Sequence, residues 1–240
     1  MTSQSKNKRI RSLHQKKFRD KHGLFIIEGL RTVKEALPAK APIDFVLTTE
    51  SFAIKNSGLF NSIKIETVSE SEMRQLSPSS TPPGILAICK IPVFNSPDMN
   101  NNFIFLDGVS DPGNMGTILR TASWFGLHQV ALSDGCIDPY NPKVVRSAMG
   151  AHFHLSWIGQ IKLEKLNDHF FIGADQRGVS INTMGKKPKK WVLVMGSEAH
   201  GLSDGVKSRL DQAVAISKIG EGESLNVGVA MGILLQKLTR

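Results

Sequence analysis

The stretch DGVSDPGNMGTILRTASWFG, residues 107–126, decides the fold of the second half of the chain. It combines the end of an apolar run, a turn rich in Asp, Pro, Gly and Asn, and a predicted helix that begins at about Asn114. Gly116 and Arg120 lie one turn apart on the side of this helix away from the core. At about 100° per residue, the apolar residues form one stripe that predicts the core-facing side: Met115, Ile118, Leu119, Ala122 and Phe125.

From residue 103 onward, short apolar runs alternate with helical segments. The runs are FIFL, QVALS, FFIGAD, WVLVMG and AVAIS, and the predicted helices cover 115–125, a segment opened by Asn141-Pro142, and 224–238. This alternation predicts a mostly parallel α/β sheet with helices on both faces. Ligands of such sheets bind at the loops that follow the carboxyl ends of the strands.

The first part of the chain predicts a smaller, mixed α/β domain. The stretch GLFIIEGLRTVKEAL has a strand pattern that is followed by a helix pattern. Further strand patterns cover residues 43–49, 63–68 and 84–91. A helix at 70–76 follows the capping-box pattern of Ser69 and Glu72. The polar run NSPDMNNN then separates the two patterns. We therefore predict a front domain at 1–94, a linker at 95–102 and a second domain at 103–240.

Charge is concentrated at the front of the chain. The 240 residues carry a formal net charge of +9, and residues 1–40 hold 11 Lys/Arg against three acids. A basic cluster favours a polyanionic partner such as RNA, although a solvated tail and an organelle-targeting presequence are open alternatives. No run is apolar enough to span a membrane, and Cys89 and Cys136 lack ligand-like spacing. We expect a cytoplasmic protein without a structural metal.

Three loops after predicted strands are rich in Gly, Ser, Asn and acidic residues. They are DGVSDPGNMG, SEAHGLS and KIGEGESLNVG, and we expect them to meet at one edge of the sheet. No G-x-G-x-x-G or Walker sequence is present, which disfavours nicotinamide and nucleoside-triphosphate chemistry. His152 and His154 share a face of a predicted strand but lack a third ligand, so we assign no metal.

These three loop sequences, in this order, resemble the signature motifs of the SpoU family of RNA ribose 2′-O-methyltransferases. DPYNPKVVRSAMGAHFHL resembles the family's additional RNA-facing segment, and residues 1–91 resemble the ribosomal-protein-like substrate-binding domain of many members. The resemblance implies a knotted, SPOUT-type second domain, S-adenosylmethionine as cofactor, and a homodimer. It also implies RNA as substrate, with ribosomal RNA ahead of transfer RNA. A catalytically lapsed RNA-binding protein is the alternative function.

The resemblance also implies roles for individual residues. Arg120 would hold the phosphate beside the target ribose, since a guanidinium is a poor base, and Gly116 would let the RNA backbone approach. Asn114 would support and cap the first helix, Glu198 would order the second loop, and Ser224 and Asn226 would cap the last helix and shape the pocket. The implied cofactor contacts are Gly196, Ile216 and Leu225, and the implied phosphate contacts are Lys143 and Arg146.

Two positions depart from the family pattern. Ser217 and Lys218 stand where members usually have Pro-Met, and Gly228 stands where they usually have Ser. Lys218 lies in the expected cofactor loop, so it bears on cofactor affinity. Trp124 lies off the core stripe of its helix, where it could pack at a subunit interface.

Overall fold

The structure is a computed structural model that describes residues 3–59 and 65–240. Its contacts divide the chain into two compact units. Unit 1 comprises Met1–Pro92 and Asp138–Phe153, and unit 2 comprises Val93–Ile137 and His154–Arg240. The domain boundaries at 1–94, 95–102 and 103–240 stay a prediction. The contact-based units differ from them in one respect, because residues 138–153 group with the front of the chain.

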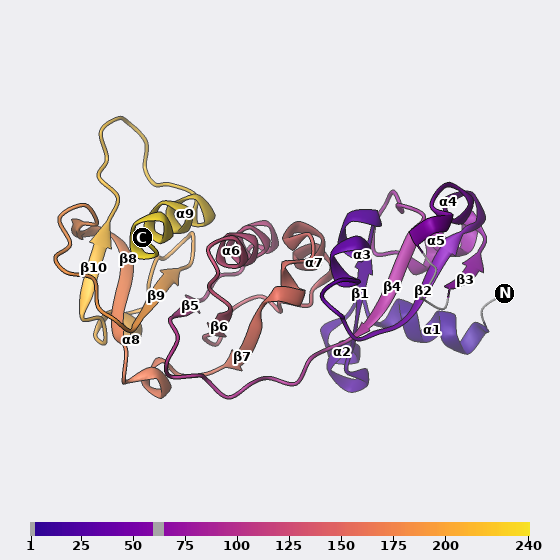
Figure 1. Cartoon of the computed structure of the whole chain (residues 1–240), viewed down its shortest axis with the longest axis horizontal. Helices are drawn as coiled ribbons and strands as arrows, with labels where there is room; N and C mark the ends of the chain where they lie inside the picture. Colours follow the sequence, from indigo (N-terminus) through magenta and orange to yellow (C-terminus); the bar gives the residue numbers. More distant parts are fainter. Residues whose placement is uncertain (1–2, 60–64) are drawn as a thin grey trace. The chain divides into compact units, whose positions relative to one another are not determined.

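Unit 1 is built on a four-stranded mixed sheet in the order β1-β4-β2-β3 (Figure 1). β4 is antiparallel to β1 and β2, and β3 is parallel to β2. This confirms the smaller mixed α/β domain, although residues 63 and 64 of one predicted strand lie outside the described residues. The strands are β1 (Leu24–Glu28), β2 (Ile43–Thr49), β3 (Ile65–Val68) and β4 (Ile85–Lys90), and the helices are α3 (Leu30–Ala36), α4 (Glu50–Lys55), η1 (Ser57–Leu59), α5 (Glu70–Leu76) and α7 (Pro142–Ala148).

The basic front segment is folded into unit 1 as two helices, α1 (Gln4–Ser12) and α2 (Lys16–His22). Ile10 and Leu13 are buried in one core cluster with residues of β1, β2 and β4. Arg19, in α2, is also buried. The reading of this segment as a solvated tail is therefore wrong. Its apolar residues are few, but they cover one edge of a core made mainly by the sheet.

Unit 2 is built on a six-stranded sheet in the order β10-β8-β9-β5-β6-β7, with every neighbouring pair parallel. This confirms the predicted parallel α/β sheet, and only β7 was missing from the predicted strands. The strands are β5 (Phe103–Asp107), β6 (Gln129–Leu132), β7 (Ser156–Gln160), β8 (Phe170–Ser180), β9 (Trp191–Gly196) and β10 (Gln212–Ala215), and the helices are α6 (Pro112–Trp124), η3 (Leu163–Leu166), α8 (Asp204–Lys207) and α9 (Val227–Leu238).

The central strands β5 and β9 are buried on both faces, which is why they read as continuous apolar runs. Phe103 and Phe105 share a core cluster with residues of η3 and α8. Ile104 and Leu106 point to the opposite face, because side chains alternate along a strand. On the helical side, α9 contacts β9 and packs against α6.

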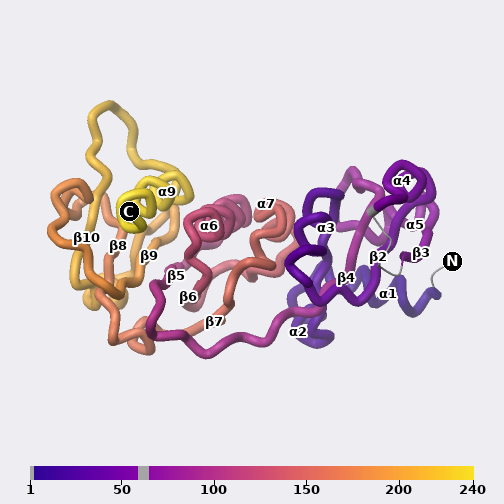
Figure 2. The backbone as a smooth tube through the Cα atoms, viewed as in Figure 1, coloured from indigo at the N-terminus to yellow at the C-terminus, as the bar shows by residue number. Residues whose placement is uncertain are grey.

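The chain reaches the edge of the sheet at β10 and then returns toward its centre. α9 follows β10 in sequence, yet it packs against α6, which follows the central strand β5. The backbone tube in Figure 2 shows the long connection between β10 and α9 and the adjacent positions of α6 and α9. This return brings the loop after β10 to the loops after β5 and β9. Among the described residues, no helix has the length and apolar character of a membrane span.

Candidate active site

The loop after β5 leads into α6 through an aspartate cap. Asp111 is the N-cap, and its Oδ1 accepts a hydrogen bond from the Asn114 N–H at 2.7 Å. Pro112 occupies the first turn, where its missing N–H costs nothing. The helix therefore begins earlier than predicted, and the prediction that Asn114 caps it is wrong. The Asp-Pro pair is itself a helix-start signal, and it identifies the cap that sequence reasoning missed.

One amide joins the three loops. Asn114 Nδ2 donates to Glu198 Oε1 at 2.7 Å, and Asn114 Oδ1 accepts from Asn226 Nδ2 at 2.6 Å. The three residues come from α6 after β5, the loop after β9 and the loop after β10. The convergence of the three loops is thus confirmed. Because the Asn114 amide uses a donor and an acceptor at once, its orientation is fixed by its partners.

The third loop ends at the cap of α9. Asn226 Oδ1 accepts from the backbone N–H groups of Gly228 at 2.9 Å and Val229 at 3.3 Å. The predicted capping role of Asn226 is confirmed, whereas that of Ser224 is wrong, because α9 begins at Val227 and Ser224 lies in the exposed loop before it. Within this loop, Lys218 Nζ donates to the Gly222 carbonyl at 2.6 Å.

The second loop is a tight turn that only glycine permits. Gly196 ends β9, and a Cβ at this position would lie 2.3 Å from the Gly201 carbonyl carbon, far inside contact distance. Ser197 and Gly201 exchange two backbone hydrogen bonds across the turn. Asp107 Oδ2, at the end of β5, accepts from the Ser203 N–H at 2.7 Å. These contacts hold the Gly196 loop against the end of the neighbouring strand.

Arg120 lies on the exposed side of α6, as predicted, and makes no hydrogen bond or ion pair with any other residue that the structure describes. It lines a groove of about 880 Å³ between α6 and α9 that Ile216 and Lys237 also border. Several apolar side chains are exposed along this groove, with Trp124 86% exposed: Trp124, Ile219, Val229 and Ile233. Gly116, in contrast, is buried, so the prediction that it leaves room for RNA beside Arg120 is wrong.

Gly228 of α9 packs directly against Thr117 of α6. A Cβ at residue 228 would lie 2.6 Å from Thr117 Cγ2 and 3.1 Å from Thr117 Cβ. The departure from the family's serine is therefore matched by the threonine on the facing helix. Gly228 is thus a packing requirement of this α6–α9 pair.

The predicted phosphate contacts Lys143 and Arg146 are exposed on α7, which belongs to unit 1, whereas Arg120 belongs to unit 2. Arg146 Nη1 donates to Ser79 Oγ at 3.3 Å. Burial raises the pKa of the Glu28 carboxyl, although a hydrogen bond from Ser77 and the positive charge of Arg146 act in the opposite direction. Arg146 thus lies close enough to the Glu28 carboxyl of unit 1 for its charge to act on the pKa of that group.

His152 and His154 lie in the short 3₁₀ helix η2 (Ala151–His154), so the prediction that they share a strand face is wrong. His152 is buried, and its Nε2 hydrogen-bonds with the Pro139 carbonyl at 2.7 Å. Burial lowers the pKa of His152 to about 4, which keeps the ring neutral at physiological pH. Among the described residues, no three His, Cys, Asp or Glu side chains are grouped as metal ligands.

Proteins of known class share this fold along its whole length. A protein from Porphyromonas gingivalis assigned to the TrmH family of RNA methyltransferases is 30% identical, with a TM-score of 0.86 over 99% of this chain and 98% of its own. An AdoMet-bound rRNA methyltransferase from Sinorhizobium meliloti is 27% identical, with a TM-score of 0.82 over 99% of this chain and 96% of its own. The fold is thus the SPOUT type that the motifs implied.

Sequence comparisons agree with the structure. The 23S rRNA (guanosine(2553)-2′-O)-methyltransferase RlmP of Bacillus subtilis is 32% identical over 98% of this chain and 97% of its own length. Residues 4–87 match the MRM3-like substrate binding domain. Residues 101–236, which contain Arg120 and the Asn114–Glu198–Asn226 contacts, match the SpoU rRNA Methylase family. By its signature loops, its fold and this match, the chain belongs to the SpoU rRNA Methylase family.

Proposed function

We propose that this protein transfers a methyl group from S-adenosylmethionine to a ribose 2′-OH of RNA, and that its substrate is ribosomal RNA. The observation that carries the proposal is the Asn114–Glu198–Asn226 junction, which joins three signature loops at the start of α6, the helix that carries the exposed Arg120. Specificity for the 2′-OH draws support from the Bacillus relative, whose name states that reaction. RNA offers this hydroxyl and DNA does not.

The residues at the three loops fit the cofactor. Ile216 and Leu225 present apolar surface at the loop after β10, with Leu225 51% exposed. The turn that Gly196 begins folds its backbone tightly back onto Gly201 and Leu202. Apolar walls combined with backbone polar groups suit a nucleoside with a charged tail. S-adenosylmethionine brings an activated methyl group, so the reaction requires no covalent enzyme intermediate. Lys218 donates to the Gly222 carbonyl within this loop and so closes the loop on itself.

Arg120 is the residue that we assign to RNA positioning. Its guanidinium can hold two oxygens of one phosphate in a bidentate geometry. Loss of a proton from arginine is unfavourable near neutral pH, because its pKa is above about 12. The proton of the 2′-OH therefore passes to the neighbouring phosphate or to water. Alignment of the hydroxyl with the methyl group is the main contribution of the protein, worth up to about 7–11 kcal/mol in model reactions.

We also propose that the protein is a cytoplasmic homodimer whose interface includes the α6–α9 groove. Exposed Trp124, Val229 and Ile233 form an apolar strip there, which water disfavours and a second copy would cover. The front unit would add RNA affinity through the exposed cations of α1 and α2, which include Lys8, Arg11, Lys17 and Lys21.

The test is ribose-methylation mapping of ribosomal RNA with and without the gene, followed by single-turnover rates on the mapped fragment. Arg120→Ala should reduce the methylation rate by orders of magnitude while cofactor binding, measured by calorimetry, stays unchanged. Arg120→Lys should stay impaired at every pH, because it lacks the planar fork. Arg209→Ala is the matched control, since Arg209 is an exposed arginine of unit 2 paired with Glu164. Recovery of the Lys variant at alkaline pH would indicate a base at residue 120, and absence of any methylation would reject the proposed function.

A further inference from the structure

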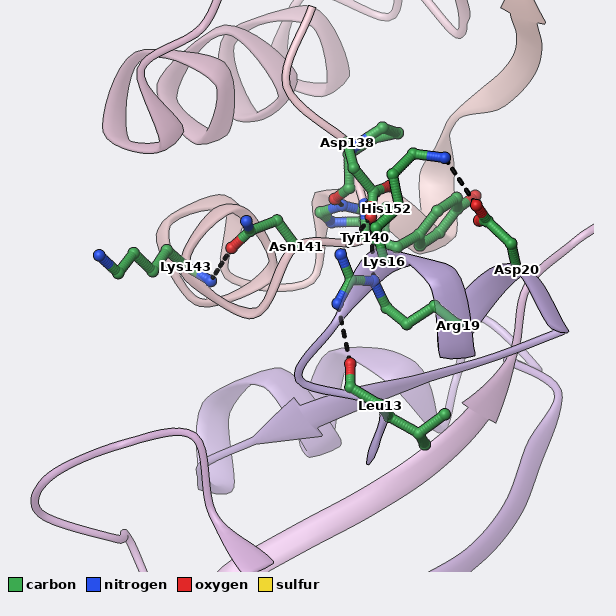
Figure 3. A network of polar contacts seen from close by, with 10 residues as sticks. Leu13, Lys16, Arg19, Asp20, Asp138, Tyr140, Asn141, Lys143 and His152 are labelled. Atoms are coloured by element: carbon green, nitrogen blue, oxygen red, sulfur yellow. Dashed lines mark hydrogen bonds and ion pairs between the residues drawn. The ribbon is translucent and has the colours of Figure 1, made fainter. Parts of the chain in front are cut away.

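A buried ion pair in unit 1 joins α2 to the segment that carries α7. Arg19 is 2% exposed, and its Nε and Nη2 donate to Asp138 Oδ2 at 2.9 and 2.5 Å. Its Nη1 donates to the Leu13 carbonyl at 2.8 Å. Figure 3 shows the guanidinium between Leu13 on one side and Asp138 on the other. The two partners are 119 residues apart in sequence, so the pair is a tertiary contact.

Asp138 in turn organises the start of α7. Its Oδ1 accepts from the Tyr140 N–H at 2.9 Å, and Asn141, the N-cap of α7, accepts from the Lys143 N–H at 2.9 Å. The Tyr140 ring packs against Phe25 of β1, with ring centroids 4.8 Å apart. The start of α7 is therefore fixed to α2 and β1 by polar and aromatic contacts together.

The end of the same segment is also fixed to unit 1. Gly150, after α7, has φ of +94°, and a Cβ there would lie 2.6 Å from Glu35 Cβ of α3. His152 is buried and hydrogen-bonds with the Pro139 carbonyl, which links the two ends of the segment to each other. Residues 138–153 thus belong to the front unit by contact, although they lie within the stretch that matches the methylase family.

Stability alone does not explain a buried pair of this kind. Removing two charges from water is costly, and apolar residues often replace such pairs without loss of stability. What the pair supplies is geometry, because two donors of one planar guanidinium converge on Asp138 Oδ2 while a third donates to the Leu13 carbonyl. The element that it orients is α7, whose exposed Lys143 and Arg146 are three residues apart and so lie on one side of the helix.

We infer that Arg19 is a positioning residue for RNA, which acts by holding α7 so that Lys143 and Arg146 engage the phosphates of the substrate together. Arg19 does not touch RNA itself, because its side chain is buried and its donors face Asp138 and Leu13. This inference rests on the proposed RNA methyltransferase function. By this inference, Lys143 and Arg146 act as RNA contacts of the front unit, although in sequence they lie between the methylase motifs.

The experiment compares RNA binding by four full-length variants, with one single-stranded ribosomal RNA fragment as the probe whether or not it is methylated. Arg19→Met with Asp138→Asn removes both charges and keeps an acceptor for the Tyr140 N–H. Lys143→Gln with Arg146→Gln removes the two phosphate contacts directly, and a quadruple variant combines the two pairs. Lys6→Met with Glu66→Gln is the matched control, since that ion pair, 2.6 Å long, joins α1 to β3 in the same unit and does not involve residues 138–153.

Each phosphate contact to single-stranded RNA contributes about 0.7 to the slope of log affinity against log salt, so loss of both lowers the slope by about 1.4. The Arg19/Asp138 variant should lose most of this slope, and the quadruple variant should bind no more weakly than the Lys143/Arg146 variant. Cofactor binding should not change, and the control should retain the parent slope. A purely structural role would not produce this lack of additivity.

Two outcomes would overturn the inference. One is a folded Arg19/Asp138 variant with the parent's salt slope, and the other is a loss that adds fully to that of the Lys143/Arg146 variant. Arg19→Lys, which keeps the charge, serves if the first variant does not fold, and unfolding of both would show that the pair acts through stability alone. If no RNA is methylated, the proposed function fails, whereas the salt slopes still decide the role of Arg19.

Discussion

Substitution of Gly228 should damage unit 2 through its contact with Thr117. In Gly228→Ala, the new Cβ would stand 2.6 Å from Thr117 Cγ2, where carbon atoms normally keep about 3.5–4.0 Å. Relief requires a shift of about 1 Å between α6 and α9. Overpacking of this kind costs about 1–3 kcal/mol, and the better helix propensity of alanine offsets up to about 1 kcal/mol.

A net loss near the middle of the resulting range, about 1–2 kcal/mol, predicts a melting temperature lower by roughly 2–8 °C, since 1 kcal/mol corresponds to about 2–4 °C for a chain of this size. Cofactor affinity should fall as well. The Gly228 N–H donates to Asn226 Oδ1, and Asn226 Nδ2 donates to Asn114 Oδ1. A displacement of α9 would therefore also displace Asn226 and weaken the Asn114–Glu198–Asn226 junction. Thr117→Ala on the facing helix should make room for the new Cβ.

The assay is a double-mutant cycle over Gly228→Ala and Thr117→Ala, read by thermal unfolding and by calorimetric titration with S-adenosylmethionine. The double variant should recover most of the stability and affinity lost in Gly228→Ala, with a coupling energy of about 1–2 kcal/mol. Gly201→Ala would not serve as a control for this cycle, because the φ of +66° at Gly201 strains any residue with a Cβ, whatever its packing. Parent-like behaviour of Gly228→Ala, or additive effects in the double variant, would refute the packing argument.

Two further predictions concern protonation and assembly. The folded-state pKa of His152 is about 4, below its ordinary value of 6.5, so the unfolded chain binds more protons between these pH values. Unit 1 should therefore lose stability as pH falls from about 6.5 to about 4. In urea unfolding at a series of pH values, His152→Gln should make the free energy of unfolding depend less on pH over this range. The same pH dependence in the parent and the variant would contradict the role of His152. Trp124→Glu should turn a dimer into a monomer in analytical ultracentrifugation, and a parent protein that sediments as a monomer would reject the α6–α9 interface.

Sequence patterns predict much of unit 2, because parallel strands buried on both faces leave long apolar runs. The runs before Asp107 and Gly196 are of this kind, and both strands were expected. The missed strand β7, SWIGQ, contains Gly159 at φ of +85° and shifts its register against β6, so it has no regular strand pattern. Helix starts were predicted less well: Asp111 and Asn114 are both capping residues by type, and the prediction overlooked Pro112, which marks Asp111 as the cap.

The front helices were missed for a different reason. Residues 1–22 are dominated by charge, and an amphipathic pattern needs more apolar residues than Ile10 and Leu13 provide. Their helices depend on tertiary contacts, including the burial of Arg19 against Asp138. A contact between residues 119 apart has no periodic signature, so no pattern in the sequence could have predicted it.

The position of Arg120 explains why catalysis and assembly are expected to depend on the same helix. The buried stripe of α6 faces the core, whereas Arg120 and Trp124, four residues apart, are neighbours on the exposed side and line the groove beside α9. If a second copy covers the strip at Trp124, Arg120 lies at the border of that interface and RNA must approach from its open side. The second copy would then close one side of the groove beside Arg120 that is open in the single chain. An RNA phosphate bound to Arg120 would be partly removed from water there, and its bidentate hydrogen bonds to the guanidinium would be stronger for that reason.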